Sequence, residues 1–105
     1  MSFVTEIYNI SKAFPKDESY GLTSQIRRCA ISIPSNIAEG YGRNSTNEYL
    51  HFLRIATGSL YELQTQMEIS MNLNYLNKEK FDKLYELSRE IERMISSLIR
   101  KISAK

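Results

Sequence analysis

The stretch STNEYLHFLRIATGSLYELQTQMEISM, residues 45–71, decides the fold. Its apolar side chains recur at alternating spacings of four and three residues, at Tyr49, Leu53, Ala56, Leu60, Leu63 and Met67. This repeat places the six side chains on one side of an α-helix. Ser45, followed three residues later by Glu48, forms a capping box and is the expected N-cap. The stretch therefore predicts a long amphipathic helix that ends before a break at Asn72–Asn77.

Helical patterns also lie on both sides of this stretch. Downstream, residues 78 to about 103 carry an apolar stripe at Phe81, Leu84, Leu87, Ile91, Met94, Leu98 and Ile102. Upstream, residues 2–14 carry a shorter stripe at Phe3, Ile7, Ile10 and Phe14. Pro15 disfavours the helical conformation of the residue before it, so we expect this helix to end at Phe14. Residues 16–20 then form a short polar turn.

The segment from about Ser19 to Tyr41 predicts a further helix, with Pro34 inside it. Its stripe consists of Leu22, Ile26, Ala30, Ile33 and Ile37. Pro34 removes a backbone hydrogen bond and clashes with the carbonyl of Ala30, so a kink is expected. The side chains expected to satisfy the freed backbone groups are those of Ser32, Ser35 and Asn36. Gly40 and Gly42 bracket the end of the helix, where left-handed backbone is usual.

Four amphipathic helices joined by short turns predict an all-α protein with one domain, residues 1–105. The expected architecture is an antiparallel up-down-up-down four-helix bundle. The first helix is short beside its partners. It either begins further upstream in a longer protein or leaves the bundle open at one end, where exposed apolar surface would favour association with another chain.

Composition excludes several kinds of site. Hydrophobic residues make up 42% of the 105 residues and charged residues 25%, which is typical of a globular protein. One cysteine and one histidine rule out an intrachain disulfide and a thiolate or histidine-rich metal site, so we expect no metal and no cofactor. No membrane span or secretory signal is visible, so a cytoplasmic location is expected.

The arginines are the candidate nucleic-acid-binding residues, although a net charge of +2 is too small to predict such binding by a monomer. Arg27, Arg28, Arg43 and Arg54 are expected around one end of the bundle, where they would contact phosphates. Tyr41 or Tyr49 would add stacking on bases. Alternatively, these arginines pair with Glu39, Glu48 and carbonyls at the kink and the turn.

Glu39 is the one residue that suggests catalysis, as a general base in a polar pocket with Arg27 or Arg28. However, no second carboxylate, metal cluster or nucleophile–base pair accompanies it. Cys29 lacks a histidine or asparagine at a recognisable spacing and is expected in the core. We therefore expect no enzymatic activity and no small-molecule substrate.

Two segments, YGLTSQIRRCAISIPSNIAEGYGR at residues 20–43 and EYLHFLRIATGSLYELQTQMEIS at residues 48–70, closely resemble a bacterial family. This is the four-helix-bundle family known from intervening sequences of 23S rRNA genes. The fold also resembles that of the accessory variability protein of diversity-generating retroelements. The matching signature positions are Gln25, Arg28, Pro34, Asn36, Glu39, Gly40, Gly42 and Arg43. This chain lacks a tryptophan that relatives usually carry in the first helix.

The resemblance implies an antiparallel bundle that assembles as a ring-shaped homopentamer with a basic surface and no enzymatic activity. Two functional hypotheses remain open. In the first, the protein is an oligomer that binds RNA or DNA directly, or that binds a nucleic-acid-processing protein. In the second, it is a scaffold or adaptor for a protein partner, for example the reverse transcriptase of the retroelement relatives, and has no nucleic-acid affinity of its own.

Overall fold

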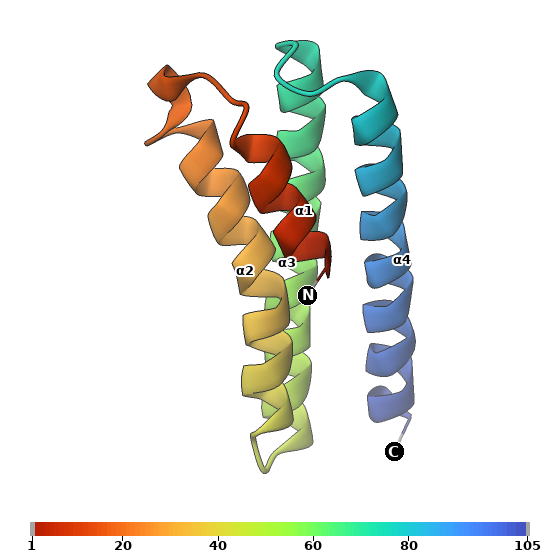
Figure 1. Ribbon diagram of the computed structural model, residues 1–105. Helices are drawn as coiled ribbons and strands as arrows, with labels where there is room; N and C mark the ends of the chain where they lie inside the picture. The colour runs from red at the N-terminus through yellow and green to blue at the C-terminus, as the bar shows by residue number, and fades with distance from the viewer. Residues whose placement is uncertain (1, 105) are drawn as a thin grey trace.

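Four α-helices make up almost all of the computed structural model, which describes residues 2–104 (Figure 1). They are α1 (Ser2–Ser11), α2 (Leu22–Tyr41), α3 (Thr46–Asn72) and α4 (Lys78–Ser103). A single 3₁₀ turn, η1 (Lys16–Glu18), lies between α1 and α2, and the described residues form no strand. The all-α prediction is confirmed. Met1 and Lys105, the ends of the predicted domain, lie outside the described residues.

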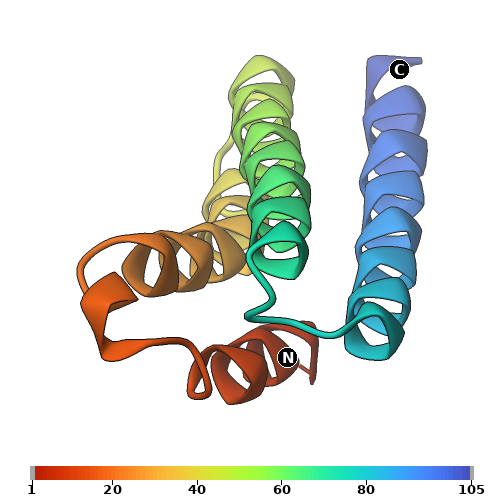
Figure 2. The ribbon, with the colours of Figure 1, turned by 90° about the horizontal axis from the view of Figure 1, so that it is seen from above.

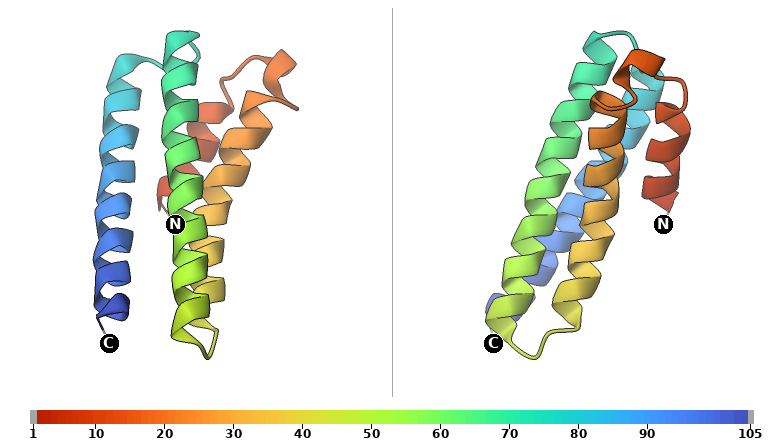
Figure 3. Two further views of the ribbon diagram at one scale, coloured as in Figure 1. Left: turned by 180° about the vertical axis from the view of Figure 1, so that it is seen from behind. Right: turned by 90° about the vertical axis from the view of Figure 1, so that its left-hand side faces the viewer.

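Successive helices run in opposite directions and pack against one another in chain order (Figure 1). Viewed from above, α1 lies diagonally opposite α3 and touches α2 and α4 (Figure 2). This is the predicted up-down-up-down arrangement. Its helices are unequal, because α1 has 10 residues whereas α4 has 26. From the side, α1 therefore accompanies only part of the length of α2 (Figure 3).

Side-chain caps define the starts of the two long helices. The hydroxyl of Ser45 accepts a hydrogen bond from the Glu48 amide at 3.3 Å, as the capping box predicts. Asn77 caps α4 in the same way, because its side-chain oxygen accepts a hydrogen bond from the Lys80 amide at 2.8 Å. Between the two helices, Asn74 adopts a left-handed conformation with φ of 65°, which allows the tight reversal within the predicted break.

The ends of the first two helices differ from the prediction. The first helix stops at Ser11 and not at Phe14, and the Ser11 hydroxyl donates to the Tyr8 carbonyl at 3.1 Å. Phe14 is nevertheless buried beside Tyr75, with ring centroids 5.6 Å apart. The second helix begins at Leu22 and not at Ser19, because the side chain of Glu18 accepts a hydrogen bond from the Leu22 amide at 3.2 Å and so caps the new start.

Pro34 lies inside α2 without breaking it. The N-terminal half of α2 leans away from α3 and the following half runs alongside it, so the helix changes direction along its length (Figure 1). The neighbouring polar side chains do not act as predicted. Asn36 donates to the carbonyl and hydroxyl of Ser32, at 2.8 and 2.9 Å, rather than to the carbonyl of Ala30. Ser35 is exposed.

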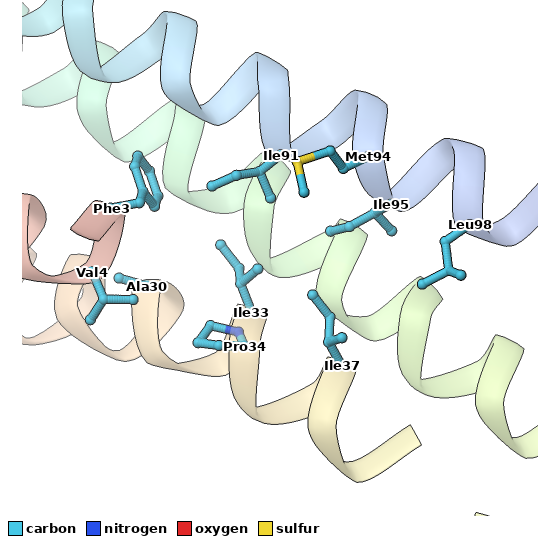
Figure 4. A pocket seen from close by; sticks show the side chains of 10 residues that line it. All are labelled: Phe3, Val4, Ala30, Ile33, Pro34, Ile37, Ile91, Met94, Ile95 and Leu98. Carbon is cyan, nitrogen blue, oxygen red and sulfur yellow. The ribbon is translucent and has the colours of Figure 1, made fainter. Parts of the chain in front are cut away.

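The predicted stripes form the core, with one exception on α4. The largest apolar side chains that are fully buried are Ile7, Ile26, Leu53, Leu60, Leu63, Met67 and Leu84. Met94, which the stripe of α4 places among them, is 70% exposed. It lies in the lining of an open groove, together with Phe3 and Ile91, and not among the buried side chains (Figure 4). Among the described residues, an apolar groove is therefore open on this side of the bundle.

The two glycines at the end of α2 do not form a left-handed turn, and Gly40 serves close packing. Gly42 has φ of −77°, and no described glycine has a positive φ, so the predicted left-handed backbone is wrong. Gly40 is buried inside the helix. A Cβ there would lie 2.8 Å from the Cβ of Phe52 and 3.0 Å from Cδ1 of Tyr49. Gly40 therefore allows α3 to approach the backbone of α2.

Replacing Leu60 by aspartate should unfold the bundle. Leu60 has no exposed surface, and the substitution would bury an unpaired charge at a cost of about 4 kcal/mol or more. Circular dichroism during heating measures the loss. The control is Thr65→Asp, which adds the same charge at an exposed position of α3 and should keep the parent melting curve. Parent-like melting of the Leu60 variant would show that this stripe is not core.

Two glycine substitutions should change stability in opposite directions. Alanine favours the helical state by about 1 kcal/mol over glycine. Gly58→Ala meets nothing within 4 Å and should gain about that amount. Gly40→Ala should instead destabilise the protein by about 1–2 kcal/mol, because the overpacking against Phe52 exceeds the gain in propensity. Urea denaturation measures both, and a stabilised Gly40 variant would contradict the close contact.

Candidate nucleic-acid interface

Arg27 is held in place by two residues of α1. Its Nε donates to the Ser11 hydroxyl at 2.8 Å, and its guanidinium lies over the Tyr8 ring, 4.8 Å from the centroid. The Arg27 side chain is half-buried and forms no ion pair with any residue of 2–104. Neutral groups therefore fix this cation, and its two terminal nitrogens have no partner among the described residues.

Arg28 follows on α2 and is exposed. It shares with Arg27 a groove of about 440 Å³ beside α1, which we call the arginine groove. Its lining residues are Tyr8, Ser19, Thr23, Ser24, Arg27, Arg28 and Ile31. None of these residues is acidic, so the two cations face a groove of hydroxyls and aromatic or aliphatic surface.

Arg43 lies in a different environment, just after the C-terminus of α2. Its guanidinium forms an ion pair with Glu39 and lies over the Phe52 ring, 5.1 Å from the centroid. Tyr41 and Tyr49, the candidates for base stacking, lie at the same end, with their rings edge to face and 6.1 Å between centroids. The charge of Arg43 is largely matched by Glu39, as the alternative interpretation predicts.

The four predicted arginines do not form one patch. Arg27 lies near the start of α2, and Arg43 follows its end. The part of the helix between them is about 20 Å long at 1.5 Å per residue. Arg54 is exposed on α3 and has no ion pair among the described residues. Two of the four, Arg27 and Arg28, share a groove, and the other two lie elsewhere.

Glu39 has none of the surroundings expected of a general base. It is exposed and pairs with Arg43, which follows one turn later. Arg27 and Arg28, its predicted pocket partners, lie about three turns earlier on the same helix. Exposed pairs of this kind contribute little to stability. Within residues 2–104, no three histidine, cysteine or acidic side chains come together as metal ligands would.

Polar groups join α2 directly to α3. The hydroxyls of Ser32 and Ser59 lie 2.8 Å apart, and the Cys29 thiol donates to Glu62 at 3.4 Å. Asn36 extends this network through Ser32. The signature positions Asn36 and Gly40 thus have packing roles. Sequence reasoning missed Ser59 and Glu62, because they lie beside the apolar stripe and carry no motif.

The surroundings of Cys29 favour the protonated thiol. Burial, followed by the hydrogen bond and the negative charge of Glu62, raises the pKa of the thiol to about 11. The reactive thiolate is therefore scarce, as expected for a core cysteine. Cys29 also borders a groove between α2 and α3, together with Gln25, Arg28, Glu62 and Gln66, and so Gln25 is another signature residue near Arg28.

An apolar groove of about 230 Å³ opens beside the first turn of α1. Figure 4 shows its side chains converging from α1, α2 and α4; they are Phe3, Val4, Ala30, Ile33, Pro34, Ile37, Ile91, Met94, Ile95 and Leu98. None of them is charged. We call this surface the apolar groove. The other exposed apolar side chains include four on or just after α3, namely Ile55, Tyr61, Ile69 and Leu73.

Comparisons with known proteins identify the family. A family model described as "23S rRNA-intervening sequence protein" matches residues 1–97. A crystal structure from Bacteroides thetaiotaomicron is also similar, with a TM-score of 0.86 and 25% identity over 93% of this chain and 92% of that one; it is described as a protein of unknown function from the S23 ribosomal protein family. No curated protein matches. None of the described helices is long and apolar enough to cross a membrane. The chain therefore belongs to the 23S rRNA-intervening sequence protein family.

Proposed function

We propose that this protein is a non-enzymatic helical bundle that associates with copies of itself and binds nucleic acid as an oligomer in the cytoplasm. The open apolar groove is the observation that carries this proposal. Ten uncharged side chains line it, and Met94 at its edge is 70% exposed. Covering such a surface contributes about 25 cal/mol for each Å² of apolar area removed from water.

The outer face of α3 is a suitable counterpart for the groove in a second copy. It carries Ile55 and Ile69, which are 37% and 42% exposed, and Leu73 follows at its end with 48%. Because α3 lies diagonally opposite α1 (Figure 2), this face and the apolar groove are on different sides of the bundle. A contact between two unlike surfaces generates a ring when the rotation closes. The resemblance to pentameric relatives favours a ring of five.

Assembly would also solve the problem of the low net charge. Five copies at +2 each carry about +10 (five times two), and each copy repeats the arginine groove. Phosphate contacts by several subunits would give binding that weakens steeply as salt rises. The names of the family and of the similar structure refer to 23S rRNA and to a ribosomal protein, so RNA is the first nucleic acid to test.

A second candidate function is an adaptor for a protein partner, such as a reverse transcriptase. An apolar groove between helices also fits the apolar face of an amphipathic helix from another protein. The exposed Met94 favours this candidate, because a flexible methionine adapts its shape to different partners. In this case the protein would bind no nucleic acid by itself.

Replacing Met94 by aspartate should dissociate the oligomer without unfolding the subunit. Met94 is mostly exposed in the single chain, so the charge disrupts the contact between copies and leaves the core intact. Light scattering after size exclusion should give an oligomer for the parent and a monomer for the variant, with equal helix content. Met94→Leu, which keeps the apolar surface, is the control and should remain oligomeric. A monomeric parent protein would contradict self-association.

The same separation, repeated with a structured RNA at low and moderate salt, tests the second half of the proposal. The parent oligomer should shift with RNA and release it as the salt concentration rises. An oligomer that ignores RNA at both concentrations would exclude nucleic-acid binding and leave the adaptor as the function.

A further inference from the structure

Arg27 is a half-buried cation without an acidic partner among the described residues. Of its donors, Nε is used by the Ser11 hydroxyl at 2.8 Å, and the guanidinium carbon lies over the Tyr8 ring, 4.8 Å from its centroid. Ser11 is itself fixed, since it is 2% exposed and donates to the Tyr8 carbonyl. The guanidinium is thus held in one orientation before any ligand arrives. An arginine usually gains most from a planar, paired contact with an anion.

The remaining lining of the arginine groove supplies further donors. Arg28 is the adjacent residue of α2. Thr23 and Ser24 bring two hydroxyls from the start of that helix, and Ser19 brings a third from the end of η1. Thr23 is only 9% exposed, and its hydroxyl has no hydrogen-bond partner in the described part of the chain. This hydroxyl is not enclosed by the protein, so it is accessible to a ligand in the groove.

The carboxylate of Glu18, which precedes the lining residue Ser19, is occupied elsewhere. One carboxylate oxygen of Glu18 accepts from the Leu22 amide at 3.2 Å, and the other accepts from the Tyr75 hydroxyl at 3.0 Å. Glu18 does not line the groove. Its carboxylate is therefore used at the start of α2 and by Tyr75, outside the lining of the groove. The lining of the groove therefore combines two cations and three hydroxyls and contains no carboxylate, while Arg28 also borders the neighbouring groove that holds Glu62.

We propose that the arginine groove binds one phosphate group through the terminal nitrogens of Arg27, with Arg28 and the hydroxyls around it. A phosphate offers several acceptor oxygens in different directions, which suits two guanidinium groups and neighbouring hydroxyls better than a single carboxylate does. This inference deepens the nucleic-acid part of the proposed function. The phosphate belongs either to a nucleic-acid backbone or to a free phosphate or nucleotide.

Two titrations distinguish these sources in the full-length protein. Fluorescence anisotropy measures the binding of a labelled 15-nucleotide single-stranded RNA over a series of salt concentrations. Calorimetry measures the binding of inorganic phosphate and of ADP. The variants are Arg27→Gln and Arg28→Gln. Arg28 is exposed, so its replacement should preserve the fold even if that of Arg27 does not. Arg100→Gln removes one charge from an exposed position near the end of α4 and is the matched control.

Arg28→Gln should weaken RNA binding about tenfold, as expected for the loss of a hydrogen bond to a charged group. It should also reduce the slope of log K against log salt by about 0.7 for each lost phosphate contact. Arg100→Gln should change neither quantity by as much. Inorganic phosphate should compete with the RNA for the parent protein and not for the Arg28 variant.

The other outcomes separate this inference from the proposed function. If RNA does not bind but phosphate or ADP does, and Arg28→Gln abolishes it, the groove is a phosphate site and the proposed function fails. If RNA binds equally to the parent and both variants and phosphate does not bind, the inference is overturned while nucleic-acid binding stands. Equal losses in Arg28→Gln and Arg100→Gln would also overturn it, because the effect would then be one of net charge.

Discussion

The close contact between α2 and α3 is the constraint on which the rest of the structure depends. At one end of the contact, Gly40 lets the backbone of α2 approach Phe52, where a Cβ would leave only 2.8 Å. Further along, the hydroxyls of Ser32 and Ser59 meet at 2.8 Å, and Cys29 donates to Glu62. These contacts are short and specific, so the helices cannot slide by one turn without losing all of them. They fix the register against which α1 and α4 then pack.

The short α1 determines both candidate surfaces of the molecule. Where it is present, its residues Tyr8 and Ser11 hold Arg27 in the arginine groove. Its residues Phe3 and Val4 line the apolar groove together with side chains of α2 and α4, and Met94 in that lining is exposed. Both grooves therefore border α1 and α2, the apolar groove at Phe3 and Val4 of α1 and the arginine groove at Tyr8. Self-association and anion binding would then use separate surfaces and could occur together.

Much of the fold could be predicted from the sequence, because apolar periodicity and caps act locally. The stripe around Leu60 and the cap at Ser45 needed no knowledge of the neighbouring helices. The errors arose where tertiary contacts decide. Nothing local shows that Gly40 faces a helix backbone, or that the helix before Phe14 ends three residues early at Ser11. Likewise, periodicity places Met94 in a stripe but cannot say whether another helix covers it.

The sequence is equally unable to show which charged side chains of the candidate site are paired. A net charge of +2 suggests weak interaction with nucleic acid, but it is a sum over cations with very different surroundings. Arg43 is matched by Glu39 and contributes little to the local potential, whereas Arg27 and Arg28 face a groove without acidic lining. An anion responds to the cations it can reach, since charges further away than about 8–10 Å are largely screened at physiological salt. Which arginines are paired therefore says more about anion binding than how many there are, and pairing depends on the fold.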